Sequence, residues 1–243
     1  MKYDIHTHIL PGMDDGAKDT ETAVAMLDME AAQGVEAVAF TPHYYRDREK
    51  PARFFARRHE AESRLSEALL AMPAERRQML PRAALGAEVA WMPNLSHWDE
   101  LEQFCIGNTE YFLLELPFRP WGSLLIDQLY ELLACTRFIP VIAHLERYFA
   151  GQKRAHIQEL YAMGLPIQFG TSSLLSLTGR GSVLRAMRGA ATYLLASDCH
   201  DLDKRRPNLE EASHAVERKL GGDALAEMDR QAGAVLCHAA PLL

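Results

Sequence analysis

Six apolar, strand-like runs of this chain each end in a side chain that can bind a metal ion. The first run leads into His6 and His8, and the last leads into Asp198 and His200. The four runs between them lead into His43, Glu88, Glu115 and His144. Successive residues of a strand point to opposite faces, so the two members of each terminal pair project together. The repeated placement predicts one polynuclear metal site at the mouth of a barrel.

Strand-like and helix-like segments alternate along the whole chain. Helices are expected over residues 20–34, 54–72, 124–135, 152–164, 209–220 and 223–232. Strands that alternate with helices imply a parallel sheet, and about seven such units without a break in composition favour one α/β barrel over two domains. Active groups of such barrels lie at the carboxyl ends of the strands, where this chain places its histidines and acids. The polar stretch 46–58 is the best candidate for a mobile loop over the site.

The composition suits a globular enzyme and argues against several other classes. Of 243 residues, 48% are hydrophobic and 24% are charged, which is enough for a full core in one domain over residues 1–243. The net charge of -7 argues against nucleic-acid binding. We find no signal peptide and no apolar run of membrane-spanning length, so we expect a cytoplasmic protein without membrane insertion. The scattered cysteines are interpreted as reduced thiols.

The motifs that carry the metal-binding side chains resemble those of a known superfamily. They are D-I-H-T-H at 4–8, D-D-G at 14–16, T-P-H at 41–43, G-A-E at 86–88, L-E at 114–115, A-H-L-E-R-Y at 143–148 and A-S-D-C-H at 196–200. Together they resemble the polymerase and histidinol phosphatase (PHP) superfamily. The D-D-G and A-H-L-E-R-Y elements are similar, more narrowly, to the bacterial capsule-type, metal-dependent protein-tyrosine phosphatases. This resemblance implies the PHP fold, a distorted (β/α)7 TIM-like barrel.

The resemblance also implies which residues hold the ions. It implies two or three divalent ions, with manganese preferred and with iron, zinc or magnesium also suited to nitrogen and oxygen ligands. The implied ligands are His6, His8, Glu88 and Asp198 for the first ion, Glu88, Glu115 and His144 for the second, and Asp15, His43 and His200 for the third. Asp15 is preferred to Asp14 because it directly precedes Gly16. Asp4 is expected to orient a ligand imidazole.

The implied activity is hydrolysis of phosphotyrosine by a metal-bound hydroxide. Arg147 and Arg205 match phosphate-binding arginines of the family, and His43 is grouped with them as a catalytic residue. Three divalent ions carry more charge than the ligand carboxylates, which leaves the site positive and suited to a phosphate monoester. The implied partner is a phosphotyrosine protein, namely a bacterial tyrosine kinase that controls capsule or exopolysaccharide synthesis. The sequence leaves open whether the chain forms a homo-oligomer.

Three other functions are weighed against this one. A histidinol-phosphate or other small-molecule phosphomonoesterase is disfavoured by the D-D-G and A-H-L-E-R-Y elements. A non-catalytic metal-binding interaction module is disfavoured because every ligand position is filled. A polymerase-associated exonuclease is disfavoured by the acidic charge and by the lack of a polymerase region.

Two local features bear on mechanism and substrate choice. Cys199 and Arg205 fit the C-x5-R pattern of thiolate phosphatases, but the residues between them include two acids and no glycine, which disfavours a phosphate cradle and a thiolate. Trp91 and Trp121 follow ligand-bearing strands and are candidates for an aryl pocket. The segment 170–173 departs from the family pattern, so the rim of the pocket is expected to differ.

Overall fold

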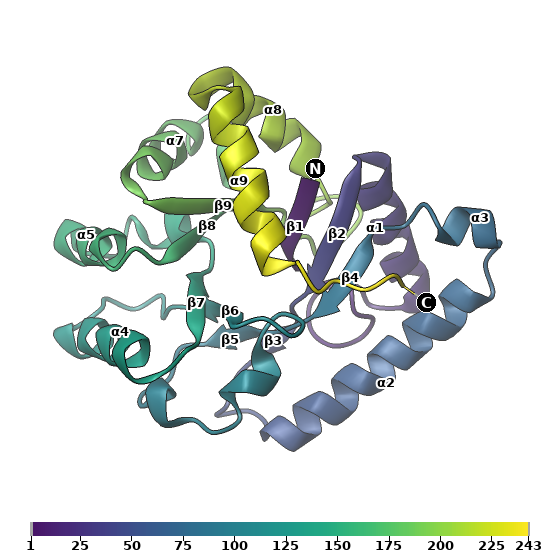
Figure 1. Ribbon diagram of the computed structural model, residues 1–243, viewed down its shortest axis with the longest axis horizontal. Helices are drawn as coiled ribbons and strands as arrows, with labels where there is room; N and C mark the ends of the chain where they lie inside the picture. Colours follow the sequence, from purple (N-terminus) through teal and green to yellow (C-terminus); the bar gives the residue numbers. More distant parts are fainter. Residues whose placement is uncertain (1, 243) are drawn as a thin grey trace.

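Parallel strands surrounded by helices form the centre of the structure, a computed structural model that describes residues 2–242 (Figure 1). The strands are β1 (Lys2–Thr7), β2 (Val35–Phe40), β3 (His43–Tyr44), β4 (Arg82–Leu85), β5 (Glu88–Ala90), β6 (Tyr111–Glu115), β7 (Ile139–Ile142), β8 (Pro166–Gly170) and β9 (Thr192–Ala196). The helices are α1 (Thr20–Ala32), α2 (Pro51–Leu70), α3 (Ala74–Arg77), α4 (Ser123–Cys135), α5 (Arg154–Ala162), α6 (Thr171–Leu175), α7 (Arg180–Gly189), α8 (Leu209–Leu220) and α9 (Gly222–Val235). Short 3₁₀ helices are η1 (Leu95–His97), η2 (Leu101–Phe104) and η3 (Leu145–Tyr148).

The strands form two sheets that short breaks separate. β1, β2 and β4 make one sheet, and β3, β5, β6, β7, β8 and β9 make the other. β3 follows β2 after two residues, and β5 follows β4 in the same way, so each pair acts as one interrupted strand. The N–H of Glu88 donates to the carbonyl of Pro42 over 3.1 Å, which connects the two interrupted strands at their breaks.

The segment after β9 pairs with β1 and closes the circle of strands. The N–H of His8 donates to the carbonyl of Cys199, and the N–H of Asp198 donates to the carbonyl of His6, each over 3.0 Å. With each interrupted pair counted as one, the described residues form seven strands around a barrel. The predicted distorted (β/α)7 barrel is therefore confirmed.

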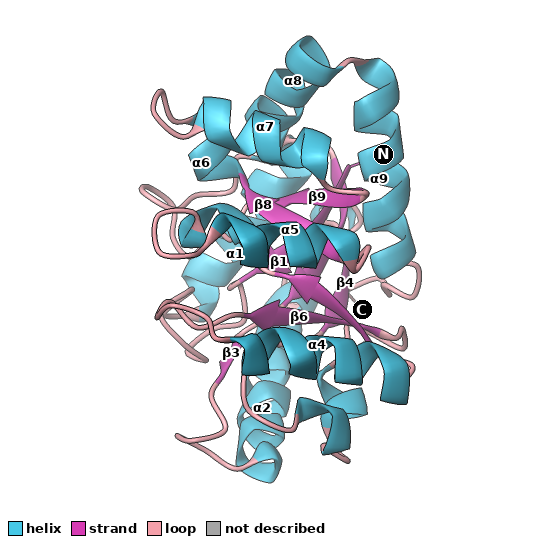
Figure 2. Ribbon diagram, turned by 90° about the vertical axis from the view of Figure 1, so that its left-hand side faces the viewer, coloured by secondary structure: helices cyan, strands magenta, loops and turns pink. Residues whose placement is uncertain are grey.

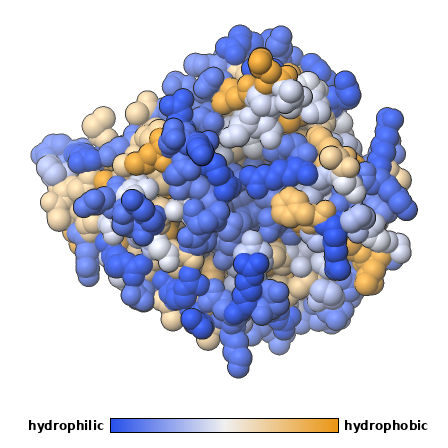
Figure 3. Space-filling model, turned by 180° about the vertical axis from the view of Figure 1, so that it is seen from behind, coloured by the Kyte–Doolittle hydropathy of each residue, from blue (hydrophilic) through white to orange (hydrophobic). Residues whose placement is uncertain are grey.

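Strand residues alternate between an inner and an outer core. On β6, Leu113 belongs to the inner core, whereas its neighbour Phe112 packs in the outer core between strands and helices. α9 closes the inner core at one end, where Val235 packs against strand residues (Figure 1). Figure 2 shows α9 and β3 on opposite sides of the strand layer. The carboxyl ends of the strands face away from α9, on a mostly hydrophilic surface (Figure 3).

Gly16 allows the loop after β1 to turn back beneath the end of the strand. A Cβ atom at this position would lie 2.1 Å from the carbonyl oxygen of His8, so the turn has room only for glycine. The N–H of Ala17 donates to the same carbonyl over 2.9 Å. This return path places Asp14 and Asp15 beside the histidines of β1, which is the physical reason for the D-D-G motif.

Two details differ from the sequence-based expectations, and a third segment can now be located. The stretch 46–58 is expected to be a loop, but α2 begins at Pro51, because proline is favoured in the first turn of a helix. Glu88 is expected directly after a strand, but it is the first residue of β5, beyond the break at Gly86. The segment 170–173, which departs from the family pattern, ends β8 and enters α6.

Within residues 2–242, no helix combines the length and the apolar character that crossing a membrane requires.

Candidate metal centre

The polar side chains at the strand ends converge into one cluster. Its possible ligand atoms form three groups, and within each group the atoms all lie within 4.8 Å of one another. The first group is His8, Asp15, His43 and His200, the second is His6, His8 and Asp198, and the third is His43, Glu88 and Glu115. His144 completes the cluster, since its Nε2 atom lies 2.8 Å from Glu88 Oε1 and 3.7 Å from Glu115 Oε1. Every ligand proposed from the sequence thus lies in this cluster. The grouping differs from the three ligand sets that the resemblance implied, because His43 also lies close to Glu88 and His8 also lies close to Asp15.

Two of the candidate ligand side chains belong to residues with unusual backbone angles beyond the strand ends. His144 has φ 32° and Asp198 has φ 52°, and each stands two residues beyond the end of its strand. A positive φ is uncommon for residues other than glycine and often marks functional positions. The turn after β7 and the turn after β9 therefore hold these side chains in conformations that an extended strand cannot provide.

The residues present fit divalent cations. His6 Nε2 and His8 Nε2 face each other over 3.0 Å, although both rings are buried. Among the described residues, Glu88 Oε2 and His200 Nε2 are buried without a hydrogen-bond partner. Buried polar atoms are normally satisfied, so converging nitrogen and oxygen atoms without partners indicate a place for positive ions.

The carboxylates and imidazoles shift each other's protonation. Burial raises the pKa of Glu88, but the imidazoles of His6, His144 and His43 outweigh burial and hold that pKa well below its usual range. Burial and the nearby Glu88 carboxylate raise the pKa of Glu115 to about 7. Burial lowers the pKa of His200 to about 4, which favours the neutral imidazole that metal binding requires.

Two residues that the sequence analysis did not assign hold the imidazoles in place. Gln168 Oε1 accepts the backbone N–H of His144 over 2.7 Å and lies 3.2 Å from His6 Nδ1. Asp14 Oδ2 lies 2.7 Å from His8 Nδ1 and accepts the backbone N–H of His43 over 2.9 Å. Partners of this kind fix the orientation of ligand imidazoles. A single polar residue within the apolar run of β8 was the available signal for Gln168.

Asp4 has a different role from the one expected. Its carboxylate accepts the backbone N–H groups of His6, over 3.2 Å, and of Ser197, over 3.1 Å, so it joins β1 to the turn after β9. In the part of the chain that the structure describes, it makes no hydrogen bond to an imidazole ring. Burial raises the pKa of Asp4 to about 6. Burial and the neighbouring Asp4 carboxylate raise the pKa of Glu30 in α1 well above its usual range.

Arg147 and Arg205 lie at the mouth of the cluster and both bind Asp198. Arg147 Nη2 donates to Asp198 Oδ2, and Arg205 Nη2 donates to Asp198 Oδ1 over 3.0 Å. Their side chains are 39% and 34% exposed, whereas Asp198 is 4% exposed. Both guanidinium groups can therefore meet a ligand that enters from solvent while they remain next to the buried cluster.

Phe118 presents an aromatic ring beside the cluster. Its side chain is 57% exposed, and its ring lies nearly parallel to the imidazole of His144, at 14° with centroids 6.2 Å apart. Tyr148 supports it from 5.2 Å. Trp121 is 5% exposed and donates from Nε1 to the carbonyl of Pro117, so it braces the loop that carries Phe118 and presents little of its ring to solvent. Trp91 is partly buried against the outer core.

Comparison with known proteins gives one consistent result. Residues 2–236 match the family model described as capsular polysaccharide synthesis, CpsB/CapC. The chain is 28% identical over 233 residues to the tyrosine-protein phosphatase YwqE of Bacillus subtilis (strain 168), which covers 90% of this chain and 85% of that protein. It is 28% identical over 242 residues to the tyrosine-protein phosphatase CpsB of Streptococcus pneumoniae, with 93% of each covered. A crystal structure from a study of these two proteins, described as unique metal-dependent tyrosine phosphatases, matches with a TM-score of 0.82 at 25% identity over 98% of this chain and 95% of that one.

Proposed function

Because the chain belongs to the capsular polysaccharide synthesis family CpsB/CapC, we propose that it is a metal-dependent phosphatase that removes phosphate from tyrosine residues of proteins. The observation that carries the proposal is a buried cluster of imidazoles and carboxylates with two arginines at its mouth. Cations and arginines together suit a dianionic phosphate ester, whose charge they can bind.

For the ions we propose the ligand sets that the sequence suggested. These are His6, His8, Glu88 and Asp198, then Glu88, Glu115 and His144, and finally Asp15, His43 and His200. The clustering of the same side chains supports the sets, with manganese as the preferred ion. When bound, divalent ions supply positive charge and a water molecule of lowered pKa.

The residues of the chain itself bind and orient the substrate. Arg147 and Arg205 are placed to donate to phosphate oxygens, since guanidinium groups match such oxygens in a bidentate way. Gln168 and Asp14 hold the ligand imidazoles. Cys199 takes no part, because burial and the Glu30 carboxylate raise the pKa of its thiol well above the usual value.

We propose that the protein substrate is a bacterial tyrosine kinase of capsule or exopolysaccharide synthesis, and that dephosphorylation takes place in the cytoplasm. The family to which the chain belongs supports the link to capsule synthesis.

Phe118 is placed to stack on the tyrosyl ring of the substrate. We expect Phe118→Ala to raise KM for an aryl phosphate about 2- to 10-fold, the scale of one aromatic pair. An alkyl phosphate should be affected much less, because it has no ring to stack. Steady-state kinetics on both esters will test this, with Met79→Ala, at an exposed position after α3, as the control. An equal effect on both esters would show that Phe118 does not recognise the ring.

A metal-reconstituted activity screen tests the proposed function. Phosphotyrosine peptides, phosphoserine peptides and histidinol phosphate are compared after reconstitution with manganese, iron, zinc or magnesium. We expect phosphotyrosine peptides to be hydrolysed most efficiently, because the site combines a phosphate-binding mouth with an exposed aromatic ring. A preference for histidinol phosphate would instead assign the chain to a small-molecule phosphatase.

A further inference from the structure

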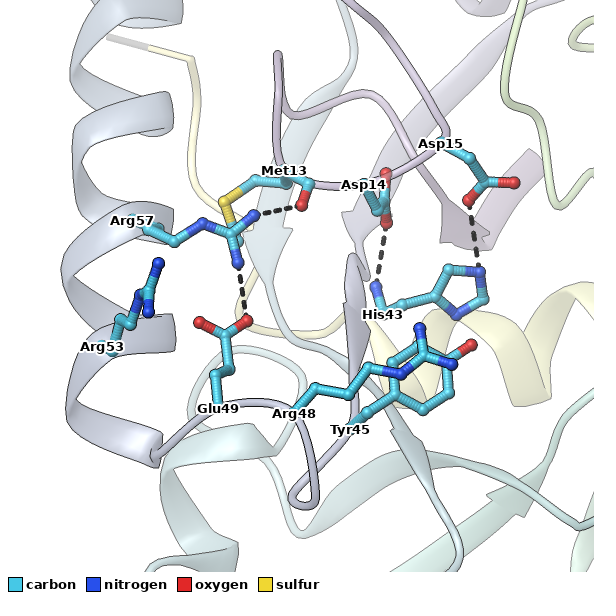
Figure 4. A pocket seen from close by; sticks show the side chains of 9 residues that line it. All are labelled: Met13, Asp14, Asp15, His43, Tyr45, Arg48, Glu49, Arg53 and Arg57. Atoms are coloured by element: carbon cyan, nitrogen blue, oxygen red, sulfur yellow. Dashed lines mark hydrogen bonds and ion pairs between the residues drawn. The ribbon is translucent and has the colours of Figure 1, made fainter.

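A cavity of about 530 Å³ opens beside the metal centre, on the side of Asp15 and His43 (Figure 4). Its wall is formed by Met13, Asp14, Asp15, His43, Tyr45, Arg48, Glu49, Arg53 and Arg57. Arg147 and Arg205, which we propose to bind the transferred phosphate, are not among the residues that line it. The cavity therefore adjoins the reaction centre and is available to another part of the substrate.

The acidic side chains of this wall are already engaged. Asp14 lies against His8 Nδ1 at 2.7 Å. Glu49 accepts from Arg57 Nη1 over 2.6 Å, and Arg57 also donates to the carbonyl of Met13 (Figure 4). Asp15 lies within 3.5 Å of His43 Nε2 and belongs to the proposed metal ligands. Little negative charge of the wall is thus left without a partner.

Two arginines of the wall have no anionic partner. Among residues 2–242, the guanidinium groups of Arg48 and Arg53 make no ion pair and no hydrogen bond. Arg48 lies over the ring of Tyr45 at 4.1 Å. Arg53 precedes Arg57 by four residues on α2, and like charges at this spacing destabilise a helix. Intramolecular ion pairs therefore do not explain why arginines stand at positions 48 and 53.

The first turn of α2 adds to the positive potential. This helix has 20 residues, begins at Pro51, and carries neither an acidic residue in its first turn nor a side-chain hydrogen bond at its N-cap. Pro51 has no N–H, and the N–H groups of Arg53 and Phe54 donate to the carbonyl of Lys50, so the contribution of this helix end is its dipole, which attracts negative charge. The helix end and the two arginines point to the same kind of ligand.

We propose that Arg48, Arg53 and the first turn of α2 form an anion subsite that binds a negatively charged side chain of the substrate peptide near the phosphotyrosine. The ligand is a carboxylate or a second phosphate on a residue that flanks the target tyrosine in the peptide, because the cavity adjoins the metal centre. The inference rests on the proposed phosphatase function. Its consequence is that phosphotyrosines in acidic or multiply phosphorylated segments are hydrolysed first.

Peptide binding and turnover test the subsite. Phosphotyrosine peptides carry alanine, glutamate or a second phosphate at each flanking position, and the same peptides are made with a non-hydrolysable phosphonate for fluorescence anisotropy on the manganese-loaded protein. We expect the acidic peptides to exceed the alanine peptide about 5- to 10-fold in kcat/KM and in affinity, as for two partly exposed ion pairs. The ratio should fall as salt rises. Comparing glutamate with phosphate decides which anion is preferred.

Charge-reversal variants test whether Arg48 and Arg53 cause the preference for acidic peptides. Arg48→Glu and Arg53→Glu should each lower the ratio of acidic to alanine peptide, and the double variant should bring it to one or below. Arg48→Gln and Arg53→Gln provide milder versions whose folding is checked by circular dichroism. Arg46→Glu is the matched control, because Arg46 is exposed in the same segment, contacts Trp98 and Met92, and does not line the cavity.

The outcomes separate this inference from the proposed function. Equal binding of acidic and alanine peptides by the wild type overturns the subsite, even when phosphotyrosine is hydrolysed well. A preference that Arg46→Glu removes and the Arg48 and Arg53 variants keep also overturns it. If no phosphotyrosine peptide is hydrolysed by metal-loaded protein, the proposed function fails, whereas the phosphonate peptides still report on the subsite.

Discussion

Asp198→Ala and His200→Ala will each lose bound metal and nearly all phosphatase activity, whereas Cys199→Ser will keep most of its turnover. The carboxylate of Asp198 lies 3.5 Å from His6 Nε2 and 3.4 Å from His8 Nε2, so its removal opens the centre of the cluster. His200 Nε2 lies 3.4 Å from Asp15 Oδ1, and its removal takes one possible ligand from the group that also contains His8, Asp15 and His43. We expect activity to fall on the order of a thousandfold, the upper range for removing one group that stabilises the transition state.

Cys199 lies between these two candidate ligands in sequence but not in space. Its side chain is fully buried, and its Sγ atom lies 3.8 Å from Glu30 Oε1 of α1. The contact with Glu30 holds the thiol on the side of α1, away from the cluster that contains Asp198 and His200. A thiol in this position cannot attack a phosphate held at the mouth of the cluster, so a serine there should be tolerated.

Three measurements check this prediction together. Elemental analysis gives metal content, steady-state kinetics give turnover, and mass spectrometry tests for a covalent phosphoenzyme. A chelator should silence the wild type, and added manganese should restore it. The metal-dependent mechanism would be wrong if Cys199→Ser were inactive with its ions in place while chelation left the wild type active.

Arg147→Ala will lower kcat/KM roughly 30- to 1000-fold, which corresponds to a loss of about 2–4 kcal/mol of transition-state stabilisation. The metal content should stay the same. Arg147 binds Asp198 but is itself no candidate ligand, and 39% of its side chain is exposed. We therefore expect it to act on the phosphate that enters. Arg147→Lys should recover only part of the loss, because an ammonium group keeps the charge but not the bidentate geometry.

Arg230→Ala is the matched control for this effect. Arg230 is 71% exposed and pairs with Glu227 on α9, a helix that lies on the opposite side of the strand layer from β3 (Figure 2). Its loss should leave both kinetics and metal content unchanged. Near-normal turnover of Arg147→Ala would remove Arg147 from the site, and a loss of metal would show that it supports the ligand Asp198 instead.

The identities of the clustered side chains could be predicted from the sequence. Apolar runs that end in His, Asp or Glu are local patterns, and parallel strands bring their carboxyl ends to one edge whatever the loops do. Strand alternation also predicted that Cys199 points away from its neighbours, and the thiol does lie against Glu30, although Asp198 has a positive φ and the segment is not extended there. Most helices were also predicted within two or three residues of their ends, since caps and apolar periodicity are local.

Only the tertiary structure decided how the cluster is arranged and supported. The closeness of His43 to Glu88 depends on the breaks within two interrupted strands, and the aim of His144 depends on a positive φ. Gln168 was missed because its role exists only where barrel closure brings β8 near both His6 of β1 and His144, which follows β7. Asp4 accepts a hydrogen bond from Ser197, which is 193 residues away along the chain. Contacts of this kind follow from barrel closure, which no short stretch of sequence encodes. The position of Arg48 and Arg53 in the wall of the cavity also became visible only in the tertiary structure.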